Sequence, residues 1–422
     1  MTKTISKYLA RQTFVPQFFK EIVNPNVGIV VTIPALAETE LLKSLESLKS
    51  CKLPEVDVEV IVAINHSIVS STEIKKQNIQ VYENALIWAS KNSSDRLRFL
   101  ITSPIELPKK HAGAGLARKI AMDEAVFRLQ NSSIENPIIA CFDGDATCTK
   151  NYLLEIWSHF LTRSKSLGCS INFEHPLNDL ESFQTQAIIQ YELHLRYYQA
   201  ALEYAKHPYA EFTVGSSMAV TRDAYVLQGG MNRRKAGEDF WFMLKLMMAG
   251  EVSALTSATV YPSARESFRV PFGTGRAMME MKEKGDYTFY TSRFESFVRL
   301  KNLLELVDEM YTNTVIVKDV LTLKFLDTVN WVETIDEIRL YTTDKESFEK
   351  RFYRWFNTFM VMKFFHFLRD EGEEDVPVLE ASQKLYPLLW KDDEAILTSS
   401  EMLKKFRQKK KSVILRLHSL IQ

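Results

Sequence analysis

Short apolar runs alternate with segments of helical spacing over the first part of the chain. Each run is continuous, rich in β-branched residues and closed by a turn residue or a polar side chain, as buried strands are. These predicted strands cover residues 27–33, 56–64, 97–101 and 137–142. Strands that alternate with helices predict a mainly parallel sheet with helices on both faces.

The segments between these runs have the period of helices. Residues 37–50 carry apolar side chains at helical spacing, and Glu38 and Glu40 are expected in the first turn, where the helix dipole favours acidic groups. Further helices are predicted over residues 73–90 and in the segment that follows Arg118. The carboxyl ends of parallel strands meet at one edge, where ligands of such sheets bind. We therefore expect four segments to converge there: Pro34, Asn65, residues 109–118 and Asp143.

The pattern changes further along the chain. Helices are predicted over residues 151–163, 184–206 and 238–249, and strands over residues 167–173, 212–221 and 254–261. Beyond about Met281 strand signals become rare and amphipathic helical patterns dominate. We predict a catalytic α/β domain over residues 1–280 and a helical region over residues 281–422.

Bulk composition limits the class of protein. The chain has 422 residues, 46% of them hydrophobic, which is enough for two domains. Its 53 basic and 53 acidic side chains cancel, so a general nucleic-acid binder is not expected. The four cysteines lack CxxC spacing and indicate reduced thiols, and neither a signal peptide nor a membrane-spanning segment is apparent. We expect a cytoplasmic protein.

Asp143-Gly144-Asp145 directly follows the strand at residues 137–142. Two carboxylates one residue apart can bind a divalent cation, and that cation can bridge to diphosphate oxygens. The alternative is an ordinary Asp-Gly turn. We predict Mn²⁺ or Mg²⁺ bound chiefly by Asp145, with Asp143 facing the ribose or a nearby water.

Two further motifs carry charge beside a predicted helix start. Residues 109–118 combine basic side chains with small residues and end at Arg118. This combination is suited to binding an anion beside the start of a helix. The alternative is a solvated basic loop. Glu238-Asp239 opens a helix, where the pair could serve only the helix dipole. Gly237 before the pair and Trp241 after it suit a site that packs a sugar ring.

Two basic segments lie later in the chain. The loop around residues 265–276 could hold a diphosphate or an anionic acceptor, and a purely structural loop is the alternative. Its candidate residues are Arg269, Gly273, Thr274, Gly275 and Arg276. Residues 404–416 are basic and amphipathic, which usually means a solvated face. They could also dock on anionic lipid, which predicts peripheral contact with the inner membrane face and a lipid-linked acceptor.

Taken in order, these motifs resemble the family 2 glycosyltransferases with the GT-A fold. The family's first strand ends in a Pro-Xaa-Xaa-Xaa-Glu turn, matched by Pro34 and Glu38. Its Gly-Xaa-Ala-Arg segment, metal motif and Glu-Asp pair are matched at residues 115–118, 143–145 and 238–239. The resemblance covers roughly residues 27–276. The Gln-Xaa-Xaa-Arg-Trp motif of processive synthases is absent, which favours single transfers.

The resemblance implies an inverting hexosyltransferase that uses a nucleotide-sugar donor. It implies that the nucleotide is bound by Pro34, Glu38, Asn65, Arg118 and Asp143, and that Asp239 is the catalytic base beside Glu238. Asn65 replaces an aspartate that contacts the nucleotide base in the family, so UDP is preferred only weakly. The acceptor is expected to be a saccharide or a lipid-linked hydroxyl in glycan or glycolipid assembly. The rival hypotheses are a nucleotidyltransferase, although its glycine- and lysine-rich signature after the first strand is absent, and a noncatalytic scaffold with a relict site.

Overall fold

The chain forms two compact units in the computed structural model, which describes residues 2–21, 23–178, 180–267, 273–390 and 397–418. The side chains of Thr2, Trp390 and residues 409–418 are outside that description. The first unit comprises residues 1–178 and 213–277, and the second comprises residues 179–212 and 278–422. The predicted division near residue 280 therefore lies close to Met278, but residues 179–212 group with the helical unit.

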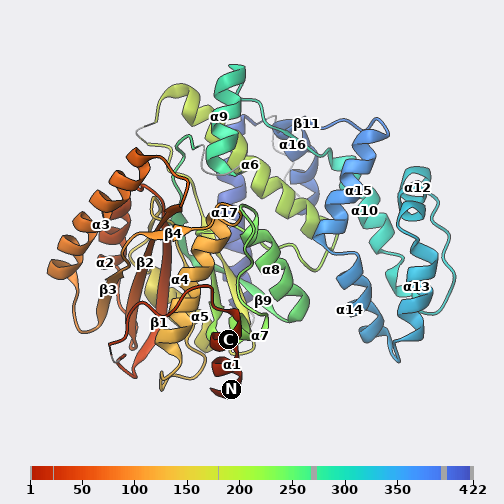
Figure 1. Cartoon of the computed structure of the whole chain (residues 1–422). Helices are drawn as coiled ribbons and strands as arrows, with labels where there is room; N and C mark the ends of the chain where they lie inside the picture. Colours follow the sequence, from red (N-terminus) through yellow and green to blue (C-terminus); the bar gives the residue numbers. More distant parts are fainter. Residues whose placement is uncertain (1, 22, 179, 268–272, 391–396, 419–422) are drawn as a thin grey trace. The chain divides into compact units, whose positions relative to one another are not determined.

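The first unit is built on a nine-stranded sheet in the order β3-β2-β1-β5-β8-β7-β9-β6, with β4 paired to β2 (Figure 1). Strands β1, β2, β3 and β5 run parallel, as do β7 and β9, whereas β8 and β6 run against their neighbours. The strands are β1 Val27–Ala35, β2 Asp57–Ser67, β3 Leu97–Ile101, β4 Ile105–Leu107, β5 Ile138–Cys141, β6 Thr147–Cys148, β7 Gly168–Phe173, β8 Met218–Thr221 and β9 Val252–Tyr261. The predicted mainly parallel sheet is confirmed.

Helices cover both faces of this sheet. They are α1 Thr2–Gln12, α2 Leu41–Lys49, α3 Thr72–Asn92, α4 Ala114–Leu129, α5 Tyr152–Thr162, α7 Arg222–Leu227 and α8 Glu238–Ala249. Alternate residues of β2, such as Val60 and Val62, join one core with α2, α3 and α5, whereas Ala63 packs with α4 on the opposite face. Figure 1 shows α4 lying along β1 and β2.

Helix α4 is buried on nearly all sides although it carries five ionic side chains. The N-terminal arm covers its outer face: Tyr8 donates a hydrogen bond to Asp123 at 2.6 Å, and the amides of Phe18 and Phe19 donate to Glu124. A charged group removed from water must find a partner, so these contacts hold the arm against the helix.

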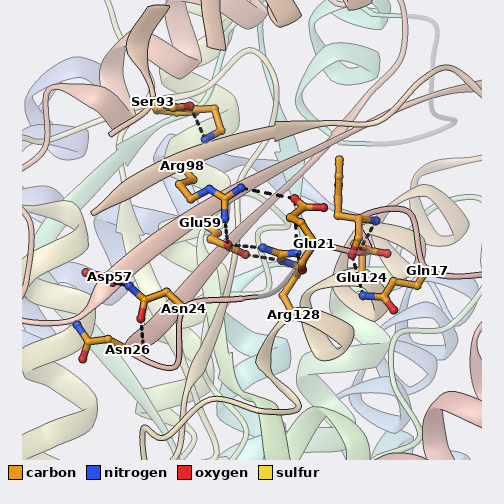
Figure 2. A network of polar contacts seen from close by, with 12 residues as sticks. Gln17, Glu21, Asn24, Asn26, Asp57, Glu59, Ser93, Arg98, Glu124 and Arg128 are labelled. Carbon is orange, nitrogen blue, oxygen red and sulfur yellow. Dashed lines mark hydrogen bonds and ion pairs between the residues drawn. The ribbon is translucent and has the colours of Figure 1, made fainter. Parts of the chain in front are cut away.

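The far end of α4 is anchored by an ion pair with the sheet. The Arg128 guanidinium donates to both carboxylate oxygens of Glu59 on β2, at 2.7 and 2.6 Å, and both side chains are fully buried. Figure 2 shows Glu21 and Arg98 beside this pair. Glu59 interrupts an apolar strand, and its alternation places it on the face of the sheet that α4 covers.

The second unit is helical, as predicted beyond residue 281. Its helices are α6 Ser182–Tyr204, α10 Phe294–Leu304, α11 Val307–Met310, α12 Val320–Thr328, α13 Trp331–Leu340, α14 Lys345–Trp355, α15 Thr358–Asp370, α16 Val378–Trp390 and α17 Ser399–His418; α9 Thr274–Lys284 runs across the division between the units. A short pair, β10 Tyr290–Thr291 and β11 Val376–Pro377, completes it. Helix α6 groups here because Leu193, Tyr197 and Ala201 share one aromatic-rich core with α10, α14 and α15.

The described part of the basic C-terminal segment is held within the second unit. Arg407 on α17 donates to Glu192 on α6, whose carboxylate is fully buried and also accepts from Arg196 at 2.7 Å. Phe406 is 4% exposed. No helix in the described part of the chain combines the length and apolar character that crossing a bilayer requires. None of the four cysteines, which all lie in the described part of the chain, forms a disulfide bond, and the Sγ atoms of Cys51 and Cys148 are 3.7 Å apart.

We expect Glu59→Gln to lower the free energy of unfolding by about 3 kcal/mol, because it leaves the buried Arg128 guanidinium without its main counter-charge. Urea denaturation of the full chain measures this. The control is Lys43→Met, which removes an exposed partner of Glu40 and should change stability by less than about 0.5 kcal/mol. Equal effects of the two substitutions would contradict the role given to the buried pair.

Candidate active site

The Asp-Gly-Asp turn lies at the end of β5, next to the end of β1. The amide of Phe142 donates to the Thr32 carbonyl, and the amide of Ala146 then donates to the Asp143 carbonyl, which closes the turn. A Cβ on Gly144 would lie 2.9 Å from the Glu38 side chain. Glycine is therefore needed for the close approach of Glu38.

Glu38 does not lie in a helix. The expectation that it belongs to the first turn is wrong, because α2 begins at Leu41. Ala37 before it adopts a positive φ of 46°, a strained conformation for a residue with a side chain, and its amide donates to Asn78. This turn directs the Glu38 carboxylate inward, where it is 3% exposed and accepts a hydrogen bond from Arg265.

Arg265 also contacts the Asp-Gly-Asp turn. Its Nη2 atom lies 2.7 Å from Oδ2 of Asp145. Arg265 is the first basic residue of the predicted second basic loop at residues 265–276, although it is not among the candidate residues of that loop. Through Arg265 the loop reaches the strand end. The pattern of basic residues indicated the loop but gave no means of identifying this contact.

Arg118 joins the other aspartate of the turn to the Glu-Asp pair. From α4 its Nη2 donates to Asp143 at 3.0 Å and its Nε donates to Glu238 at 3.2 Å. The guanidinium is buried, and its Nη1 has no hydrogen-bond partner among the described residues. Residues 120 positions apart in sequence are thereby brought into one charged cluster.

Glu238 and Asp239 open α8, as predicted. Gly237 precedes them with a φ of 67°, which glycine adopts without strain, and Asp239 Oδ1 accepts from the amide of Phe240. Burial, the neighbouring Glu238 charge and the lesser charge of Asp143 raise the pKa of Asp239 to about 7, against the opposing effect of Arg118. A carboxyl group with such a pKa can exchange a proton near neutral pH.

Three glycines allow the segments of the cluster to approach one another. A Cβ on Gly113 would lie 2.7 Å from the Lys235 backbone, and one on Gly115 would lie 2.2 Å from the Arg234 carbonyl oxygen. The small residues at the start of α4 thus allow the loop that precedes α8 to pack closely against them. A Cβ on Gly215 would lie 2.7 Å from Arg118 Nη2 and 3.1 Å from Asp239 Oδ2.

Gly215 lies in a turn rather than in the predicted strand over residues 212–221. Only the last four of these residues form β8, Met218–Thr221. The small side chains that we assigned to a strand instead allow the backbone to pass close to Arg118 and Asp239.

The remaining nucleotide candidates lie at the ends of β1 and β2. Pro34 of β1 pairs with Ala63 of β2, but it lies beyond Thr32, the last residue of β1 that pairs with β5. The N–H that proline lacks is therefore not needed for the pairing of β1 with β5. Asn65 is buried and lies within β2, which extends past the predicted end at residue 64. Its amide group donates to the carbonyls of Ala35 and Ala63, so this side chain joins the two strand ends.

The second basic loop is described only at its base. Arg269 lies outside the described residues. The Ser267 amide donates to the Gly275 carbonyl, and His175 Nε2 lies 3.3 Å from Thr274 Oγ1. Gly273 has a φ of 101°, and Arg276 is partly buried. The base of the loop is thus fixed beside the strand end of β7.

Trp241 has a cation close to its ring. The Arg234 guanidinium lies 4.4 Å from the ring centroid, within the range of a cation–π contact. Among the described residues, no group of three or more His, Cys, Asp or Glu side chains is arranged to hold a metal ion. Each carboxylate of the Asp-Gly-Asp turn is instead paired with an arginine.

The fold is a mostly parallel α/β sheet with the Asp-Gly-Asp turn at a strand end, in a chain that ends in a helical region, which is the architecture that the motifs predicted. No family model matches the chain, and no curated protein matches its sequence.

Among solved structures, the chain is similar to S. aureus TarS residues 1–349 in complex with UDP-GlcNAc. The TM-score is 0.37 and the sequence identity is 14%, over 92% of this chain and 91% of that chain. The same fragment in complex with UDP gives a TM-score of 0.35 and 14% identity over the same shares. Another structure of S. aureus TarS gives 0.33 and 15% over 67% of this chain and 46% of that chain.

The raised pKa of Asp239 predicts a pH-dependent stability. The folded state holds this proton up to about pH 7, whereas the ordinary pKa is 3.8, so stability falls as pH rises between these values. Asp239→Asn cannot ionise and should be more stable than the wild type at pH 8, on the order of 4 kcal/mol, with a smaller gain, on the order of 1–2 kcal/mol, at pH 5. Thermal unfolding at both pH values measures this.

The exposed Asp95→Asn serves as the control for changing a carboxylate to an amide in the same unit. It should show no gain that grows with pH. A stability difference for Asp239→Asn that is the same at both pH values would contradict the raised pKa.

Proposed function

We propose that the protein is a metal-dependent, inverting glycosyltransferase. It moves a sugar from a nucleotide-diphosphate donor, preferably UDP, to a hydroxyl group of a saccharide or lipid-linked acceptor. The observation that carries the proposal is the contact of Arg118 with both Asp143 and Glu238. This contact links the Asp-Gly-Asp turn, which is suited to a nucleotide diphosphate, with the Glu-Asp pair, which is suited to proton transfer. The turn and the pair therefore belong to one site.

The donor would lie against the ends of β1, β2 and β5. Pro34, Glu38, Asn65 and Asp143 line these ends, and the loop from Gly273 to Arg276 begins near β7. Asp143 is partly exposed and is paired with Arg118 through one oxygen. Its other oxygen suits a ribose hydroxyl, while Arg265 and Arg276 supply positive charge for phosphate oxygens.

The residues at the turn fit a metal that is held together with the donor. Mg²⁺ is usually bound in proteins by one or two carboxylates, with substrate phosphates and water as its other ligands. Asp145, which is 24% exposed, would be the main protein ligand. When bound, Mn²⁺ or Mg²⁺ would neutralise negative charge on the departing diphosphate.

Asp239 would act as the general base. Direct displacement at the anomeric carbon requires a group that accepts the proton of the acceptor hydroxyl as the new bond forms. A pKa of about 7 suits this task, since the carboxylate is available near neutral pH and still has high proton affinity. Glu238 contributes to that affinity through its charge, while Arg118 limits the shift.

We expect the second unit to select the acceptor and support the catalytic unit, since its described residues offer no second cluster of catalytic carboxylates. The basic segment at residues 404–416 would contact an inner membrane face. Within that segment, Phe406 and Arg407 already pack inside the second unit. Any lipid contact would therefore use other side chains of α17.

We expect UDP to bind the full chain with an affinity that Mn²⁺ raises, because the cation joins the diphosphate to Asp145. Calorimetry of UDP with and without Mn²⁺ measures this, and Asp145→Ala should lose most of the metal dependence. GDP serves as the competitor. Tighter binding of GDP would contradict the preference for UDP, and unchanged metal dependence in Asp145→Ala would remove that residue as the ligand.

We expect Asp239→Asn to lower the transfer rate by roughly a hundredfold or more, since it keeps the shape of the side chain and removes its basicity. UDP affinity should be kept. In the wild type the rate should fall below about pH 7, as the base becomes protonated. Near-normal transfer by the variant would exclude Asp239 as the base, and a product with the donor's anomeric configuration would exclude inversion.

A further inference from the structure

Arg265 lies between two carboxylates that come from different segments. One atom, Nη2, donates to Glu38 after β1 and lies 2.7 Å from Asp145 Oδ2 after β5. Glu38 is almost fully buried, whereas Asp145 and Arg265 are partly exposed. Two negative groups are thus joined by one positive nitrogen at the strand ends.

This nitrogen lies on the side of Asp145 where Oδ2 would bind a cation. Magnesium coordinates oxygen at about 2.0–2.1 Å, so an ion on the Oδ2 atom that faces Arg265 would overlap with the guanidinium. Like charges would also repel at this distance. Arg265 and a divalent ion therefore cannot share this side of the Asp145 carboxylate.

We propose that Arg265 occupies the cation position of Asp145 and is exchanged for a divalent ion when a nucleoside diphosphate binds. This inference rests on the proposed function and specifies how the site is loaded. The diphosphate provides oxygens that a guanidinium can bind through two parallel hydrogen bonds, so Arg265 gains a new partner as it leaves Asp145. Asp145 would then hold the divalent ion, whose charge would offset that of Asp145 and of the same diphosphate.

The exchange couples the two ligands. Without nucleotide, a cation must displace Arg265 from Asp145, which weakens cation binding. With nucleotide, the guanidinium has phosphate oxygens to bind, and the cation has them as additional ligands. By linkage, the factor by which UDP strengthens Mn²⁺ binding equals the factor by which Mn²⁺ strengthens UDP binding.

The experiment is a calorimetric titration of the full chain with MnCl₂, with and without saturating UDP. The variants are Arg265→Gln, which removes the charge, and Arg265→Lys, whose ammonium keeps it but lacks the planar fork. Arg163→Gln removes an exposed charge of the same unit at the end of α5 and is the matched control. Circular dichroism and thermal unfolding establish that each variant is folded.

We expect Arg265→Gln to bind Mn²⁺ without UDP about tenfold more tightly than the wild type, a typical size for coupling between two ligands. UDP should then strengthen Mn²⁺ binding less than it does in the wild type. Arg265→Lys should fall between the two proteins, and Arg163→Gln should match the wild type. If Arg265→Gln does not fold, the comparison of Arg265→Lys with the wild type decides the question.

Mn²⁺ affinity without UDP that is unchanged or weaker in Arg265→Gln would overturn the inference, as would Arg265→Lys no tighter than the wild type. Either result would contradict only the exchange of Arg265, and not the proposed function, provided that UDP still binds the wild type in a Mn²⁺-dependent way. Failure of UDP to bind the wild type contradicts the proposed function itself. The two failures are therefore distinguishable in one set of titrations.

Discussion

Charge burial along helix α4 is the constraint on which the first unit depends. An ionic group inside a protein is tolerated only with a partner. Lys119 and Asp123 pair with each other within α4, and all five ionic side chains of the helix also contact other segments. Arg118 pairs with the turn after β5 and with α8. Lys119 donates to Tyr8, and Asp123 accepts from Tyr225. Glu124 accepts from the arm at residues 18–19, and Arg128 pairs with β2. The helix thereby fixes the N-terminal arm, the sheet and the candidate active site together.

The candidate site follows the same rule of compensation. Arg118 and Arg265 each contact two carboxylates, so Glu38, Asp143, Asp145 and Glu238 all have a positive partner. The pKa of Asp239 is raised to about 7, because burial and Glu238 outweigh Arg118. Strain at Ala37 and close packing at Gly215 belong to the same region. Strain such as that at Ala37 reduces stability and is typical of sites that have a chemical task.

The second unit is organised by a different interaction. Its core is rich in aromatic side chains, among them Phe297, Phe348, Phe352, Phe364 and Phe365, and edge-to-face contacts such as that of Tyr197 with Phe297 join its helices. Its buried charge is concentrated at Glu192, which binds Arg196 and Arg407. This contact joins the helix inserted between the halves of the first unit's chain to the C-terminal helix.

The amino-acid sequence by itself determined the alternation of strands and helices, the Asp-Gly-Asp turn at a strand end and Glu-Asp at a helix start, because these depend on local periodicity and on neighbouring residues. It could not determine which carboxylate meets which arginine, that α6 joins the helical unit, or that the polar residues of α4 are buried. A charged residue has the same local pattern whether water or a distant partner surrounds it. Only the tertiary structure, by bringing residues such as Glu38 and Arg265 together, decided these partners and the raised pKa of Asp239.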